Sequence, residues 1–214
     1  MILPNRQAWL EERKKAICGS DAAAILGLNP YMTNVELWEN KTGKKEQKDI
    51  SEKSYVQYGI QAERPMRELF ALDYPKFDVA YHEFDLKEHK QYSFIRATLD
   101  GELFDRETLR IGVYEGKTTE LLNSYRKESW KDRVPDNYFC QLIHNIMTFD
   151  ADFGYLNARL KSEFQGEISI QEKRYYIDRK EVDNDIDYLL GKEVEYWNKY
   201  VIPDIKPSLI LPPI

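Results

Sequence analysis

The hydrophobic positions in the N-terminal part of the chain recur at helical spacing, and glycine, proline and polar stretches interrupt them. This pattern predicts helices over Trp9–Lys15 and Asn34–Thr42, with a short helix between them that stops at Gly27. Ser20 or Asp21 is a good N-cap for the short helix. The chain therefore begins as a helical segment.

A longer helix follows over Tyr58–Tyr74, after a polar stretch. Met66 and Phe70 belong to its apolar stripe, and Glu63 lies on the same stripe. Pro65 implies either the first turn of the helix or a local kink. An acid on an apolar stripe is a candidate for a buried functional group.

The period then changes to two, which indicates strands over Val79–Leu86, Tyr92–Leu99 and Leu109–Glu115. Asp100-Gly101 is typical of a turn, and we expect the last two strands to form a hairpin whose loop is Glu102–Thr108.

The second half of the chain alternates between the two periods. It predicts helices at about 121–130 and 135–149, strands at 153–160 and 168–176, and a last helix with a capping box, followed by an extended tail from Pro203. The capping box pairs Asp178 with Glu181. Together these elements predict an α/β fold with a mixed central β-sheet flanked by helices.

Composition narrows the class of protein. The chain has 214 residues, 42% of them hydrophobic, which suits one domain with a substantial core. No apolar run is long enough for a membrane span, and the N-terminus lacks the order of a signal peptide, so we expect a cytoplasmic protein. Two cysteines and three scattered histidines exclude a disulfide framework or zinc-hydrolase ligand set. Any metal should therefore be held by carboxylates, which favours Mg²⁺, with Mn²⁺ possible.

The net charge of −6 argues against a surface-wide nucleic-acid coat, but the charge is segregated. Lys117–Arg133 and the first 48 residues are mildly basic, whereas acids dominate Asp178–Glu195. This distribution fits a mildly basic cleft, although each segment could also be an ordinary solvated face. Trp130 could stack on a base, but core packing is the more common role.

Of five Glu-x-Lys tripeptides, one has an unusual setting. The strand period places Glu115 and Lys117 on the same face as apolar residues, where burying charge costs several kcal/mol unless each group finds a partner. A divalent cation would be a partner for Glu115, and Gly116 would let the backbone approach a bound ion or phosphate closely. A cross-strand ion pair is the alternative.

Two further carboxylates complete a candidate site. The expected hairpin makes Asp100 a near neighbour of Glu115, and Glu63 comes from the preceding helix. Separately, Asp100 could be only a turn residue and Glu63 only a first-turn acid. Three converging acids and a lysine form a plausible Mg²⁺-dependent phosphodiesterase site.

The order of helix Glu, then Asp, then Glu-x-Lys resembles the PD-(D/E)xK nuclease superfamily. Several motifs are similar to the YqaJ-like viral recombinase family, which includes lambda exonuclease. These are Arg13-x₆-Ser20, the block Gly19–Tyr31, Tyr58-Gly59-x₃-Glu63-x-Pro65, Thr98-Leu99-Asp100-Gly101 and Tyr138-Phe-Cys-Gln141. The resemblance covers about residues 9–200.

This resemblance implies a restriction-endonuclease-like core and a 5′→3′ exodeoxyribonuclease on linear double-stranded DNA. It implies that Glu63, Asp100 and Glu115 bind the metal, that Lys117 is the catalytic lysine and that Gln141 supports the site. It also implies that Arg13 and Ser20 hold the 5′-phosphate of the DNA; otherwise they would be a surface charge and an N-cap.

The same resemblance gives the expected organisation and partners. We expect one domain over 1–214, with a helical 5′-phosphate-binding part (about 1–54), the nuclease core (about 55–160) and a C-terminal strand and helix (about 161–214). The product would be a 3′ overhang for a single-strand annealing protein in phage-type recombination, made by a ring-shaped homotrimer. Alternatives are an endonuclease or single-strand nuclease on the same core, or a non-catalytic DNA-binding or phage regulatory module.

The chain departs from the family pattern at three places. The interval from Asp100 to Glu115 is long, so either the hairpin loop is enlarged or the register differs from the one expected. Leu99 stands where proline is common, and Ile143 where a second glutamine often appears.

Overall fold

The computed structural model describes residues 1–45, 50–121 and 128–211. Its helices are α1 (Arg6–Lys14), α2 (Gly19–Ile25), α3 (Asn34–Lys41), α4 (Ser54–Asp73), α6 (Asp136–Phe149) and α7 (Asp183–Tyr196). A 3₁₀ turn (Arg179–Glu181) precedes α7, and a π-helical turn (Trp197–Val201) follows it. The strands are β1 (Ile17–Cys18), β2 (Phe77–Ala80), β3 (Lys87–Glu88), β4 (Ile95–Ala97), β5 (Gly101–Asp105), β6 (Ile111–Glu120), β7 (Phe153–Phe164) and β8 (Glu167–Asp178).

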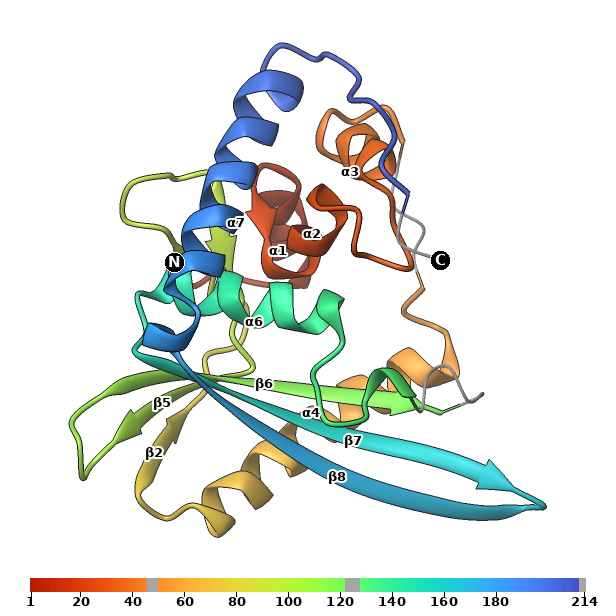
Figure 1. Cartoon of the computed structure of the whole chain (residues 1–214), viewed down its shortest axis with the longest axis vertical. Coiled ribbons are helices and arrows are strands. Elements are labelled where there is room, and N and C mark those ends of the chain that lie inside the picture. Colours follow the sequence, from red (N-terminus) through yellow and green to blue (C-terminus); the bar gives the residue numbers. More distant parts are fainter. Residues whose placement is uncertain (46–49, 122–127, 212–214) are drawn as a thin grey trace.

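The main sheet has five strands in the order β2-β5-β6-β7-β8. Strands β6 and β7 are parallel and the other neighbours are antiparallel, so the sheet is mixed. A smaller sheet has the order β1-β4-β3. The helices α4 and α6 lie on opposite faces of the main sheet, and the remaining N-terminal and C-terminal helices stack beyond α6 (Figure 1). The predicted α/β class with a mixed sheet flanked by helices is confirmed.

Two apolar layers hold the helices against the sheet. On the α6 side, the core joins α2, α6 and α7 to β6 and β7 through residues such as Ala22, Ile143, Leu156 and Leu189. On the α4 side, a largely aromatic cluster is formed by Phe70, Phe77, Leu103, Tyr114 and Phe153. Strand β6 therefore lies between two packed layers, which is why its central residues are buried.

The predicted hairpin of Tyr92–Leu99 with Leu109–Glu115 is wrong. Asp100-Gly101 is no turn, because Gly101 begins β5, which pairs antiparallel with β6 and places Gly101 opposite Tyr114. The long interval between Asp100 and Glu115 is thus a strand and a tight turn, not an enlarged loop. β4 belongs to the smaller sheet.

Other predicted boundaries also shift. The expected strand Val79–Leu86 is wrong over most of its length, because β2 ends at Ala80 and β3 begins only at Lys87. Cys18, not Ser20 or Asp21, is the N-cap of α2, and the Asp21 carboxylate accepts the Cys18 N–H at 3.0 Å. Pro65 lies in the interior of α4, so the first-turn alternative is wrong.

The C-terminal half follows the prediction more closely. The predicted capping box of the last helix is an exception, because Asp178 accepts the N–H of Lys180 and caps only the 3₁₀ turn, whereas Val182 is the N-cap of α7. Trp130 is 2% exposed, so it packs in the core and is not available to stack on a base. The predicted helix 121–130 lies mostly outside the described residues.

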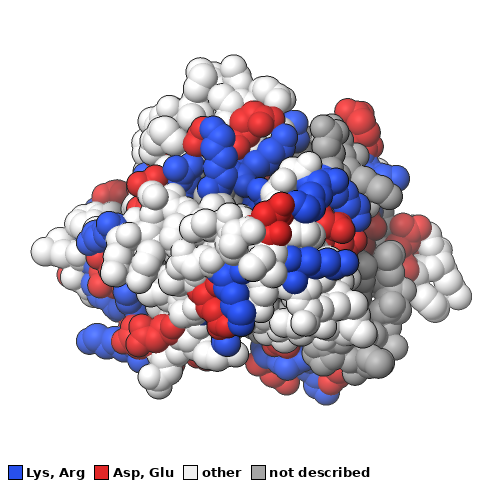
Figure 2. Space-filling view, turned by 90° about the horizontal axis from the view of Figure 1, so that it is seen from above, with Lys and Arg blue, Asp and Glu red and all other residues white. Residues whose placement is uncertain are grey.

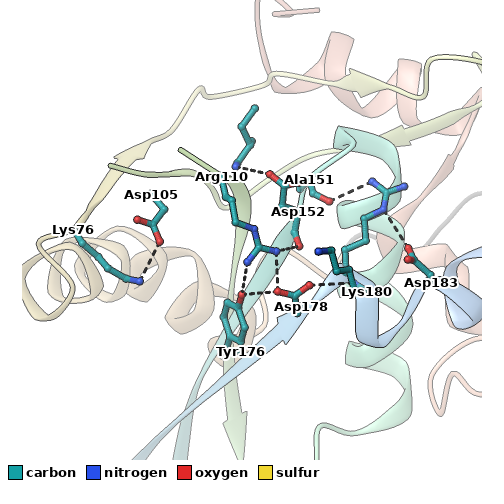
Figure 3. Close-up of polar contacts among 11 residues, drawn as sticks. Lys76, Asp105, Arg110, Ala151, Asp152, Tyr176, Asp178, Lys180 and Asp183 are labelled. Carbon is teal, nitrogen blue, oxygen red and sulfur yellow. Dashed lines mark hydrogen bonds and ion pairs between the residues drawn. The ribbon is translucent and has the colours of Figure 1, made fainter. Parts of the chain in front are cut away.

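Charged side chains of both signs are interspersed on the face seen from above in Figure 2. At one end of the main sheet, a polar network fixes the strand ends (Figure 3). The Arg110 guanidinium donates to the Asp178 carboxylate and to the Asp152 carbonyl, each at 2.8 Å, and to the Tyr176 hydroxyl at 3.1 Å. Among the described residues, no helix combines the length and the apolar character that a membrane crossing requires.

Candidate active site

Glu115 occupies the middle of the main sheet. It lies on β6, between β5 and β7, and is 1% exposed. Its Oε1 accepts hydrogen bonds from Lys117 Nζ and Gln141 Nε2, both at 2.6 Å. Its Oε2 accepts one from Asn145 Nδ2 at 2.8 Å. The buried carboxylate is therefore held at both oxygens by donors from its own strand and from α6.

Asp100 lies beside Glu115, although the hairpin that brings it there is not the predicted one. It immediately precedes β5, and its Oδ2 accepts the N–H of Gly116 at 2.9 Å. Its carbonyl oxygen accepts a hydrogen bond from Arg67 Nη1 on α4 at 2.7 Å. The predicted neighbourhood of Asp100 and the Glu115-Gly116-Lys117 segment is therefore present.

Glu63 reaches the same region from α4 and is partly buried. Burial, and after it the charge of Asp100, raises the pKa of Glu63 to about 7, against the opposing charges of Lys117 and Arg67. Burial and Asp100 likewise raise the pKa of Glu115 to about 7. Three carboxylates thus share one electrostatic neighbourhood in which their negative charge is costly.

Lys117 supplies a positive charge to this group. Burial alone would lower its pKa, but the charges of Glu115 and Asp100 raise the pKa above the usual range. Its ammonium also lies 5.5 Å from the ring centre of Tyr138 on α6. Lys117 is therefore a fixed cation in the site.

A divalent cation suits this donor set. Among residues 1–45, 50–121 and 128–211, no three His, Cys, Asp or Glu side chains already surround a common point as a formed metal site would. The three acids nevertheless offer oxygen ligands of the kind that Mg²⁺ and Mn²⁺ prefer, and they repel one another without a cation. Glu63, Asp100 and Glu115 are the residues that would hold it.

Arg13 and Ser20, from α1 and α2, form a second group. Arg13 Nη2 donates to Ser20 Oγ at 2.9 Å, and Arg13 Nη1 to Thr98 Oγ1 at 3.4 Å. The guanidinium carbon lies 4.5 Å from the ring centre of Trp9, whose Nε1 donates to Thr98 Oγ1 at 2.9 Å. Thr98 is two residues before Asp100 in the chain, so its contacts with Arg13 and Trp9 connect this second group to the three acids and Lys117.

A buried ion pair between Lys41 and Asp21 contacts the backbone of Arg13. Lys41 Nζ lies 2.6 Å from Asp21 Oδ2, and both side chains are almost fully buried. The same Nζ donates to the main-chain oxygen of Arg13 at 3.0 Å. The end of α1 is thus fixed relative to α2 and α3.

Sequence reasoning missed Asn145, Arg67, Trp9 and the side-chain contact of Thr98. Asn145 could have been found, because it lies four residues after Gln141 and so on the same helix face. Trp9 has the same relation to Arg13. Arg67 follows Glu63 by four residues, but nothing in the sequence shows that it binds the carbonyl of Asp100.

The family model described as the YqaJ-like viral recombinase domain matches residues 8–152. The YqaJ protein of Bacillus subtilis (strain 168) is 28% identical over 206 residues, which is 96% of this chain and 59% of that protein. The chain thus spans less than two thirds of the length of this relative.

Two solved structures share the fold. An alkaline exonuclease from Laribacter hongkongensis is similar with a TM-score of 0.58 and 16% identity, over 90% of this chain and 95% of that one. A phage related exonuclease from Haemophilus somnus 129PT is similar with a TM-score of 0.52 and 13% identity, over 87% and 95% of the two chains. At such identities the likeness establishes the restriction-endonuclease-like fold.

Proposed function

This chain belongs to the YqaJ-like viral recombinase family, and we propose that it is a Mg²⁺-dependent 5′→3′ exodeoxyribonuclease on linear double-stranded DNA. Two proteins that share its fold are named as exonucleases, which supports nuclease chemistry on this core. The proposal places the activity in the cytoplasm of a bacterial host, on a phage or prophage protein.

The observation that carries the proposal is the contact of Glu115, Lys117 and Asp100 at the middle of β6, with Glu63 in the same electrostatic neighbourhood. Glu115 and Lys117 are in contact at 2.6 Å, and Asp100 bonds to the N–H of the intervening Gly116 at 2.9 Å. The pKa of Glu63 responds to the charges of Asp100 and Lys117. A site with excess buried negative charge and one fixed cation suits a metal-assisted phosphodiesterase.

A bound Mg²⁺, or Mn²⁺, would polarise the phosphoryl oxygen and make a water nucleophilic near neutral pH. Glu63, Asp100 and Glu115 would hold it. Gln141 would orient the Glu115 carboxylate. The Lys117 ammonium would orient the attacking water or neutralise the charge that develops on the phosphorane.

Arg13 and Ser20 would hold the 5′-phosphate of the strand being cut. The Arg13 guanidinium is held by Ser20, Thr98 and the ring of Trp9, so its donors are fixed before DNA arrives. A pre-organised arginine next to a hydroxyl is well suited to a phosphate.

The wider expectations belong to the same proposal. One domain would combine the helical part (about 1–54), the nuclease core (about 55–160) and the C-terminal strand and helix (about 161–214). The product would be a 3′ overhang that passes to a single-strand annealing protein. A ring-shaped homotrimer would keep the enzyme on its DNA.

The test uses linear duplex DNA labelled at its 5′ or its 3′ ends, with Mg²⁺, and a closed circular duplex as control. We expect early release of the 5′ label while the circle remains intact. Cutting of the circle would show an endonuclease on the same core. Absence of cleavage in both Mg²⁺ and Mn²⁺ would favour a non-catalytic DNA-binding module.

A further inference from the structure

Asn145 makes a contact with the candidate site that the proposed function does not use. It lies on α6 and is 1% exposed. Its Nδ2 donates to Glu115 Oε2 at 2.8 Å, whereas Lys117 and Gln141 both bind the other oxygen, Oε1. Asn145 is therefore the donor that holds Oε2, the carboxylate oxygen that Lys117 and Gln141 do not contact.

The other end of the same amide faces α2. A Cβ atom on Gly19, the first residue of α2, would lie 2.6 Å from Asn145 Oδ1 and 3.1 Å from Gln141 Cγ. A contact of 2.6 Å is too short for a real methyl group. Glycine lets the backbone of α2 approach the two amides of α6, and an alanine at this position would force the Asn145 amide to shift.

The orientation of the amide follows from these two contacts. Turning it over would bring Oδ1 against the Glu115 carboxylate, and two acceptors repel. In the present orientation Oδ1 is buried and has no hydrogen-bond donor within the part of the chain that the structure describes. Leaving a buried acceptor unpaired costs free energy, so the orientation is maintained by Glu115 and by the space at Gly19.

We propose that Asn145 is a positioning residue that aligns the Glu115 carboxylate for a divalent cation, and that Gly19 keeps Asn145 in place. This inference rests on the proposed function, because it takes Glu115 as a metal ligand. Gly19 directly precedes Ser20, which contacts Arg13 at 2.9 Å. Ser20 is one of the two residues proposed to hold the 5′-phosphate. The helix that carries it, α2, therefore packs against the residue that positions the proposed metal ligand Glu115.

The test measures Mg²⁺ binding without DNA, from the melting temperature as a function of Mg²⁺ concentration. Loss of a group that orients a metal ligand typically costs 10–100-fold in metal affinity. We expect Asn145→Ala to raise the half-saturating Mg²⁺ concentration by about tenfold or more. Gly19→Ala should raise it too, because the new methyl group displaces the amide while keeping it in the protein.

The double variant separates this coupling from two independent defects. In Asn145→Ala the Oδ1 atom that a Gly19 methyl group would meet at 2.6 Å is gone, and the contact that remains, with Gln141 Cγ at 3.1 Å, needs a shift of only a few tenths of an ångström. We therefore expect Gly19→Ala to raise the half-saturating Mg²⁺ concentration much less in that background. An equal effect of Gly19→Ala in both backgrounds would overturn the coupling, and a normal Mg²⁺ response of Asn145→Ala would overturn the positioning role.

Asn34→Ala is the matched control. Asn34 is 2% exposed, and its amide holds the tail through the Ser208 carbonyl and the Ile210 N–H. We expect it to lower the metal-free melting temperature without changing the half-saturating Mg²⁺ concentration. If Asn145→Ala does not fold, Gly19→Ala still tests the positioning role. No Mg²⁺ response in the unsubstituted protein would instead reject the proposed function.

Discussion

At the scale of single residues, the candidate site combines the buried carboxylate of Glu115, which is bound by side chains, with the partly buried acids Asp100 and Glu63. Burying the charge of the Glu115 carboxylate at 1% exposure costs free energy, but hydrogen bonds from three donors offset this desolvation cost. The Glu-x-Lys spacing predicted two members of this group. Gln141 came from the resemblance, and Asn145 was not found, since a polar residue on a helix does not reveal which strand its amide faces.

Arg13 provides a prediction at this scale. Its guanidinium is fixed by Ser20 Oγ, by Thr98 Oγ1 and by the Trp9 ring. We expect Arg13→Ala to slow cleavage of 5′-phosphorylated duplex ends by about tenfold or more, and to slow cleavage of 5′-hydroxyl ends much less. Initial rates on the two substrates measure this difference.

The control for Arg13→Ala is Lys192→Ala, which removes a partly exposed cation from α7. It should affect the two kinds of end equally. If Arg13→Ala also slows both kinds of end by the same factor, Arg13 has no role in recognising the end.

At the scale of elements, the main error of the sequence prediction concerns which strand pairs with β6. The alternation of Tyr92–Leu99 predicts a strand that pairs with Leu109–Glu115, but β4 is three residues long and pairs with β1 and β3. The true partner of β6 is β5, which begins at the dipeptide expected to be a turn. Asp100-Gly101 fits either structure, and only the partner strand decides between them.

A buried ion pair between α6 and α7 gives a prediction for these elements. His144 and Glu193 are 0% exposed, with Nδ1 2.7 Å from Glu193 Oε1 and Nε2 2.9 Å from the Arg96 carbonyl oxygen. Both ring nitrogens thus face acceptors, which favours the imidazolium. Burial opposes this charge, but Glu193 and the Arg96 carbonyl raise the pKa of His144.

Because the pKa is raised in the folded state, this stabilisation is complete below the ordinary value of 6.5 and is lost as the pH rises through the folded-state value. Glu193→Gln removes the charge that retains the proton. We expect it to lower the free energy of unfolding by about 2 kcal/mol at pH 6 and by less at pH 9. Urea unfolding at the two pH values measures both, and an equal loss would show that His144 is neutral throughout.

At the scale of the whole molecule, the net charge of −6 coexists with lysine and arginine side chains among the acids on the face seen in Figure 2. The predicted basic segment Lys117–Arg133 includes Arg126 and Lys127, which lie outside the described residues. The fold class could be predicted because periods of two and 3.6 alternate along the chain. The stacking of α2 on α6 could not, because it depends on Gly19 meeting Asn145 across distant segments.

Metal binding should be visible in the stability of the whole chain. Glu63 and Glu115 have pKa values raised to about 7 because their charges are buried near Asp100, and a cation would relieve that repulsion. We expect millimolar Mg²⁺ to raise the melting temperature by about 3 °C at pH 8. Addition of a chelator should reverse the shift. Absence of a shift would contradict metal binding by these carboxylates.

The most direct test of the central claim compares the unsubstituted protein with Lys117→Ala on linear duplex DNA in Mg²⁺. Lys117 contacts Glu115 at 2.6 Å but is not itself a metal ligand. We expect the unsubstituted protein to release nucleotides. Lys117→Ala should be slower by at least about a hundredfold, although Mg²⁺ still raises its melting temperature. Equal rates for the two proteins would contradict the assignment of the active site.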